Sequence, residues 1–414
     1  MPGAELFASS TSKHDGDARG PWVRSLAWDV VWLQSALWLV PLALLLAYGY
    51  ADPTESPLDL LCFGLTALFW IGHRIGSTWL AYATTAYRPL LRAEPVRFVI
   101  VPLAITAACF AILLPADEAL PFTRAERVVA LVILDYAFVT YHFATQHFGV
   151  LSLYRVRAGG AGAGWPRRID RLFALGVGGA LVVLAEAVAE MNVFKGEWLD
   201  PWLDRDWLAG ASGDLRVVAT GLVIVLTLAL IAMEARASRP SLPRVLYAAG
   251  VALMVAGGLH TDQPFLFVVI WSAQHWLAAT ALATRVARAE PAPQESPLRR
   301  ALHAMNRRPW ALLLVLGLLS VLLLPLMEVE AIGPEETHYG DRIFGSIAVQ
   351  LRESHWVPAL LALGFATGFL HYWLDRAVYR LSDPAVRLAA RGLLEADTPE
   401  PSKGRSRAHA VRRR

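Results

Sequence analysis

Long apolar runs separated by short polar segments divide the chain between residues 26 and 377. Each run is long enough to cross a bilayer core of about 30 Å, since a helix rises about 1.5 Å per residue. We expect spanning helices at 26–49, 58–83, 96–115, 128–152, 170–190, 215–235, 243–259, 264–285, 309–327 and 356–377. The pattern therefore predicts an all-α polytopic integral membrane protein with about ten transmembrane helices.

The charges between these runs alternate along the chain. Lys and Arg gather after every second run, whereas the other loops carry mainly Asp and Glu. Because short cytoplasmic loops are enriched in Lys and Arg, this alternation predicts cytoplasmic termini in a bacterial-type inner membrane. We expect a disordered cytoplasmic tail at 1–24, a transmembrane helical domain at 25–380 and a basic cytoplasmic tail at 381–414.

The composition agrees with this interpretation and excludes others. Hydrophobic residues make up 56% of the chain and charged residues 18%, with a mean hydropathy of +0.43, which is too apolar for an ordinary soluble protein. The net charge of +3 is small and reflects topology, so we expect no nucleic-acid partner. Cys62 and Cys109 both lie in apolar runs, which favours buried thiols over a disulfide or a thiolate metal site.

Histidine is the residue that points to chemistry. Five of the eleven histidines fall inside expected spans, in the second, fourth, eighth and tenth, all of which run in the same direction. Their positions along these helices place them in one band in the cytoplasmic half of the bilayer. They are His73, His142, His147, His275 and His371. Because ionisable groups inside a membrane are costly and mark functional sites, we interpret these five as ligands of a buried metal ion.

Three further side chains are candidates for roles beside the histidines. Asp375 follows His371 by one helical turn, where a carboxylate can hold the imidazole in one tautomer. Asp135 precedes His142 by two turns, and Tyr141 adjoins His142, so we assign both to the catalytic group. Imidazole together with carboxylate favours iron, with copper or zinc as less favoured metals.

These residues also carry a resemblance. The segment YHFATQH at 141–147 resembles the HxxxxH form of the first histidine box of the fatty-acid desaturase and alkane hydroxylase class of membrane oxygenases. In that class clustered histidines hold two irons, so the resemblance implies iron-dependent oxidation of a lipid. The sequence contains no HxxHH box, and its five intramembrane histidines fit one metal ion, or no metal at all, better than two. The wider pattern, with YHFATQHFGVLSLYR and HYWLDRAVYR, resembles a family of uncharacterised, histidine-rich, multi-pass bacterial membrane proteins.

We therefore expect a metal-dependent membrane oxidoreductase or oxygenase that acts on a membrane lipid or another apolar small molecule and uses a redox partner. Three alternatives use the same histidines. They are axial ligands of a b-type haem, titrating groups of a transporter or proton-coupled carrier, or polar groups that hold helices together in a non-catalytic lipid-binding or assembly protein.

Overall fold

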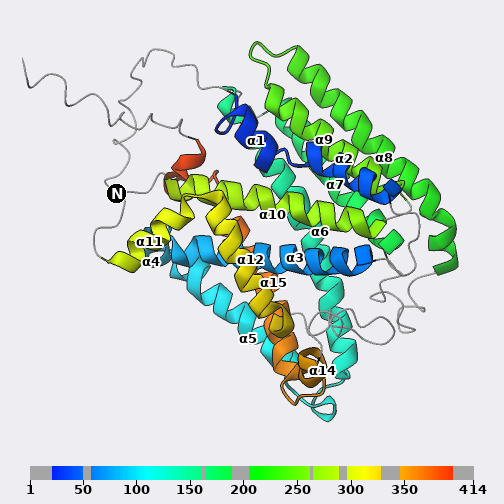
Figure 1. The fold of residues 1–414 in the computed structure, drawn as a ribbon, viewed down its shortest axis with the longest axis vertical. Helices are drawn as coiled ribbons and strands as arrows, with labels where there is room; N and C mark the ends of the chain where they lie inside the picture. Colours follow the sequence, from blue (N-terminus) through cyan, green and yellow to red (C-terminus); the bar gives the residue numbers. More distant parts are fainter. Residues whose placement is uncertain are drawn as a thin grey trace, which may run out of the picture.

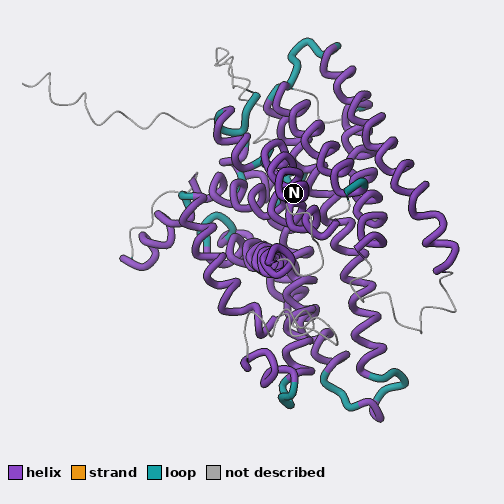
Figure 2. The backbone as a smooth tube through the Cα atoms, turned by 45° about the vertical axis from the view of Figure 1, so that its right-hand side comes forward, coloured by secondary structure: helices purple, strands orange, loops and turns teal. Residues whose placement is uncertain are grey.

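The computed structural model describes residues 21–49, 57–159, 164–188, 205–261, 264–288, 296–327 and 346–394. The secondary structure in these ranges is entirely helical, as the apolar pattern predicted (Figure 2). The longer helices are α2 (Ala36–Gly49), α3 (Pro57–Ala83), α5 (Val101–Leu113), α6 (Arg124–Arg157), α7 (Trp165–Val188), α8 (Arg205–Ala235), α9 (Leu242–Leu259), α10 (Pro264–Arg288), α12 (Pro309–Met327) and α15 (Val357–Val378).

Shorter helical elements connect or end these helices. They are α1 (Leu26–Trp32), α4 (Arg88–Ala93), α11 (Pro297–Asn306), α14 (Ser346–Arg352), α16 (Pro384–Ala389), the π-helical turn η1 (Val96–Ile100) and the 3-10 turns η2 (Asp117–Ala119) and η4 (Arg391–Leu393). The turn η1 runs directly into α5, so the two form one continuous rod.

The structure supports part of the set of ten spans that we expected. Among the described residues, six helices are long and apolar enough to cross a membrane, and eight qualify if each of two bent pairs counts as one span. The pairs are α1 with α2, bent by 48°, and α11 with α12, bent by 105°. The bend between α1 and α2 falls at Gln34 and Ser35, inside one apolar run. Two polar residues change the mean hydropathy of such a run too little to reveal a bend.

The helix α10 forms the centre of the bundle (Figure 1). It crosses the middle of the molecule beside α3, with α2, α7, α8 and α9 on one side and α5, α12 and α15 on the other. In its most apolar 18-residue stretch, 83% of α10 is buried inside the protein. The corresponding share for α8, which lies at the periphery, is 17%. A polar side chain on α10 is therefore surrounded by protein.

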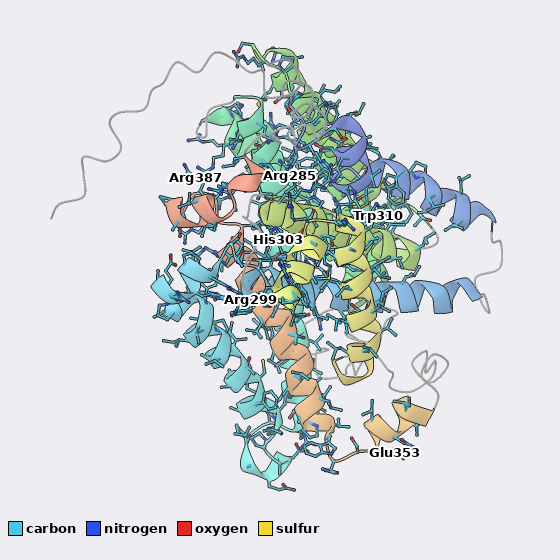
Figure 3. The ribbon with its side chains drawn as sticks, turned by 60° about the vertical axis from the view of Figure 1, so that its left-hand side comes forward. Arg285, Arg299, His303, Trp310, Glu353 and Arg387 are labelled. Atoms are coloured by element: carbon cyan, nitrogen blue, oxygen red, sulfur yellow. The ribbon has the colours of Figure 1, made fainter. Side chains whose placement is uncertain are left out.

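One end of the bundle gathers basic segments (Figure 3). Arg285 at the end of α10, Arg299 on α11 and Arg387 on α16 lie toward this end, whereas Glu353, next to α14, lies far from them. The turn η4 packs on α10, and its Leu393 is buried. The packed helices thus continue through the first residues of the segment that we assigned to the C-terminal tail.

A buried ion network joins α6, α7, α8 and α9 near their ends. Asp170 on α7 is fully buried and pairs with both Arg155 on α6 and Arg244 on α9. Arg244 also pairs with Glu234 on α8, and the Glu234 carboxylate accepts a 2.6 Å hydrogen bond from the backbone N–H of Ser241. Two arginines and two carboxylates therefore balance one another inside the protein.

Candidate metal centre

Four of the five intramembrane histidines meet at one point in the bundle. His73 on α3, His142 on α6, His275 on α10 and His371 on α15 each offer a ring nitrogen, and these atoms all lie within 4.8 Å of one another. None of the four residues is more than 7% exposed. We had predicted that these histidines meet because they lie at a common depth along their helices.

The Nε2 atom of His142 lies at the centre of this group. It is 3.0 Å from His275 Nε2, 3.0 Å from His371 Nε2 and 3.4 Å from His73 Nε2. A ring nitrogen takes part in one hydrogen bond as donor or as acceptor, so hydrogen bonding among the rings does not satisfy all three contacts. Nitrogens bound about 2.1 Å from one metal ion are about 3.0 Å apart at right angles and about 3.4 Å apart in a tetrahedron. The three distances to His142 Nε2 are therefore those of donors that share one cation.

Asp375 lies beside this group, through a contact that the sequence did not predict, but its oxygens are not among the atoms that lie within 4.8 Å of one another. Its Oδ2 atom is 3.4 Å from His142 Nε2 and 4.0 Å from His73 Nε2. The distance from Asp375 Oδ1 to His371 Nδ1 is 3.9 Å, which is too long for a hydrogen bond. The carboxylate thus faces the cluster of Nε2 atoms and does not orient His371 as its one-turn spacing had suggested.

Ser77, which was not among the candidate residues, orients His371 instead. Its Oγ atom lies 2.8 Å from His371 Nδ1, and the same hydroxyl interacts with Asp375. A His371 N–H that donates to Ser77 leaves Nε2 with a lone pair directed at the other three rings. One signal was available, because Ser77 follows His73 by one turn of α3 and shares its face.

The fifth histidine, His147, does not join the group. Its Nδ1 atom lies 2.8 Å from the hydroxyl oxygen of Tyr247 on α9. Positions five residues apart on a helix point about 140° apart, so His142 and His147 cannot face one centre from a regular helix. We correct its assignment as a metal ligand and place it in a separate polar cluster.

Tyr141 and Asp135 also lie apart from the four histidines. Tyr141 is 52% exposed, because neighbouring positions on a helix point about 100° apart and His142 faces inward. Asp135 is electrostatically coupled to Arg74, and both pack on Gly368 of α15. A Cβ atom at position 368 would lie 3.1 Å from Asp135 Oδ1 and 3.6 Å from Arg74 Cζ. Neither Asp135 nor Tyr141 is therefore among the residues whose ligand atoms converge, and their catalytic role stays a prediction.

Two small cavities adjoin the four histidines, and His73 lines both. Each has room for about one water-sized group. The first is lined by all four histidines, by Arg74 and Ser272, and by apolar and aromatic side chains. The ring of one of these, Phe143, stacks on His275 with centroids 4.1 Å apart. The second is lined by Asp375, Ser77 and other residues of α3, α10, α12 and α15.

The donor set restricts which groups the site fits. Imidazoles with a nearby carboxylate suit iron, zinc or copper(II). No thiolate is added to these donors by Cys109, which is buried in a different cluster, on α5. A haem needs space for its macrocycle between two axial imidazoles. Here the four ligand nitrogens lie within 4.8 Å and the adjoining cavities are far smaller than a macrocycle. The b-type haem that we considered does not fit these residues.

Comparisons of this chain with protein-family models, with curated proteins and with solved structures give no match. The chemistry of the site is therefore inferred from its own residues.

Proposed function

We propose that this protein is a metal-dependent membrane oxidoreductase with one iron ion held by four histidines, with Asp375 beside them. The observation that carries this proposal is the set of three Nε2 atoms at 3.0 to 3.4 Å from His142 Nε2, with a carboxylate oxygen at 3.4 Å. Bound iron supplies one-electron chemistry and reaction with O₂. The protein fixes the donors on four different helices and excludes bulk water from them.

The surroundings of the first cavity support a lipid-soluble substrate. Phe138 on α6 is 44% exposed at the outer surface and stacks on Tyr372 of α15, with ring centroids 6.1 Å apart and planes 9° apart. The Tyr372 ring in turn lies 5.3 Å from the ring of His142. Aromatic side chains thus lead from the lipid-facing surface to the histidines. We propose that an apolar chain enters along this stack, between α6 and α15.

The proposal includes an orientation in the membrane. The basic end of the bundle, with the C-terminus of α10 and the helices α11 and α16, faces the cytoplasm of a bacterial-type inner membrane. The helices α3 and α7 then complete a set of ten spans, in which each bent pair counts once. An external redox partner supplies electrons.

A transporter is the second candidate. The bent pairs α1–α2 and α11–α12 favour it, because interrupted helices are found at transport sites. None of the four histidines lies on these helices, however, and their ring nitrogens already converge on one another. We therefore rank transport below oxidation.

The test uses protein loaded with Fe²⁺ in nanodiscs made from host membrane lipids. A chemical reductant and isotopically labelled O₂ are added, and the lipids are analysed by mass spectrometry. Labelled lipid is expected with wild type and with His260→Ala, a control at the end of α9, and not with His275→Ala. Iron that binds and then crosses the membrane of vesicles, with no labelled lipid, would support transport instead. Failure to bind iron would contradict the oxidoreductase and favour the transporter.

A further inference from the structure

A second group of buried polar side chains lies between α6, α9, α10 and the bend that joins α1 to α2. None of its members is a ligand of the proposed metal centre, and none is more than 1% exposed. We call this group the inner polar cluster; it consists of Gln34, Ser35, His147, Tyr154, Tyr247 and Gln274.

Contacts within the cluster form a connected series. His147 Nδ1 lies 2.8 Å from the Tyr247 hydroxyl, and Gln274 also interacts with Tyr247. The ring of Tyr154 lies 6.2 Å from that of Tyr247, and Gln34 Nε2 donates a 3.4 Å hydrogen bond to the Tyr154 hydroxyl. The bend between α1 and α2 makes this arrangement possible, because it directs Gln34 into the bundle.

The two ends of the series lie in different surroundings. At one end Tyr154 interacts with Asp29, a buried carboxylate that accepts hydrogen bonds of 2.8 and 3.0 Å from the backbone N–H groups of Val23 and Arg24. Asp29 is fully buried, whereas Arg24 and the next three residues are exposed. At the other end, His147 interacts electrostatically with His275 of the metal centre.

Several polar atoms of the cluster have no hydrogen-bond partner among the described residues. They are Gln34 Oε1, Ser35 Oγ, His147 Nε2 and Gln274 Oε1. A buried polar atom that loses water without gaining another partner is strongly unfavourable, and most such atoms in proteins are satisfied. Bound water molecules with two to four polar neighbours supply these partners in protein interiors. Four such atoms in one cluster therefore indicate a site for several waters.

We propose that the inner polar cluster holds a file of bound water and carries protons between Asp29 and the metal centre. The inner end of this path rests on the proposed function, because an oxygenation that forms water takes up protons as well as electrons. Each tyrosine, histidine and water accepts one proton and gives up another, so every group returns to its starting state. A centre buried among apolar helices needs such a path.

The water is tested by X-ray radiolytic labelling of the purified full chain, which modifies buried side chains that contact bound water. Tyr87 is the internal control, because it is fully buried but its hydroxyl donates to the backbone carbonyl of Val378 at 2.6 Å. Tyr154 and Tyr247 are expected to be labelled at least about ten-fold faster than Tyr87. Equal protection of the three tyrosines would overturn the proposal.

The path is tested by proton uptake. Protein loaded with iron and then oxidised is reduced chemically in the presence of a pH-sensitive dye. Tyr247→Phe is expected to slow proton uptake by about ten-fold or more while its iron content stays at the wild-type value, whereas Tyr87→Phe keeps the wild-type rate. Unchanged uptake in Tyr247→Phe would overturn the path. Absence of bound iron in wild type would overturn the proposed function instead, and the labelling result would still decide whether the water is present.

Discussion

Ser77 on α3 and His371 on α15 are joined by a 2.8 Å hydrogen bond across 294 positions of the sequence. The bond ties a residue of one ligand helix to the ligand of another. It also sets which nitrogen of His371 carries its proton, and therefore which nitrogen is available to a metal. The affinity of the centre for metal thus depends on a hydroxyl that does not itself lie among the converging ligand atoms.

Removing this hydroxyl is expected to weaken metal binding without unfolding the protein. Ser77→Ala should lower the affinity for Fe²⁺ by about 10- to 100-fold, the usual effect of losing a group that orients a histidine ligand. Competition with a metal chelator measures this change. The control is Ser320→Ala, since Ser320 is equally buried but donates to the backbone carbonyl of Leu316. Equal affinities for the two variants would contradict the role of Ser77.

Gly72 sets the approach of α3 to α10 next to His73. A Cβ atom at this position would lie 2.7 Å from Trp276 Cζ2 and 3.0 Å from Ser320 Oγ, so these side chains would have to move. We expect Gly72→Ala to lower the free energy of unfolding by about 1–3 kcal/mol and to weaken metal binding.

The matched control for this substitution is Gly179→Ala on α7, where no atom lies within 4 Å of the added methyl group. Gly179→Ala is expected to raise the free energy of unfolding by up to about 1 kcal/mol, because alanine has a higher helix propensity than glycine. Denaturant titration in detergent compares the two variants. The interpretation of Gly72 as a packing contact would be wrong if both substitutions changed stability in the same direction.

Arg244 should be a strong determinant of stability. Its loss leaves the buried carboxylates of Asp170 and Glu234 without their shared cation, although Arg155 still pairs with Asp170. We expect Arg244→Ala to lower the free energy of unfolding by about 3–5 kcal/mol.

The exposed Arg236 provides the control, and Arg236→Ala should change the free energy of unfolding by less than about 0.5 kcal/mol. The double variant Arg244→Met/Glu234→Met should recover part of the loss, because it removes the cation together with one of its anions. Thermal denaturation in detergent measures all three proteins. Equal melting temperatures for Arg244→Ala and Arg236→Ala would show that the network is not stabilising.

The helices were predictable because a membrane core requires long apolar runs, and each expected run contains a helix. The bends were not. Gln34 and Ser35 are only two polar residues in an apolar run. The contacts at the bend, from Gln274 to the Leu33 carbonyl and from Gln34 to Tyr154, join positions that are far apart in the sequence. Charge counts had a similar limit. Arg155 and Arg244 indicated cytoplasmic loops in the sequence, but both are buried in ion pairs.

The meeting of four histidines followed from their common depth, since four helices of one bundle bring equal depths together. The direction in which each side chain points around the helix axis decided which other candidates reach the four histidines. His147 and Tyr141 share α6 with His142 but lie about 140° and 100° away from it around the axis, which removes both from the centre. The contact of Asp375 with His142, across two helices, required the packing of α15 against α6 and has no counterpart in local spacing.

The most direct test of the central claim is the metal content of protein purified in detergent and loaded with Fe²⁺, measured by elemental analysis. The account predicts one iron per chain in wild type, loss of iron in both His142→Ala and His275→Ala, and retention in His147→Ala, a buried histidine of the same helix. Folded wild-type protein that holds no iron after loading would contradict the account. Equal loss of iron in all three variants would also contradict it.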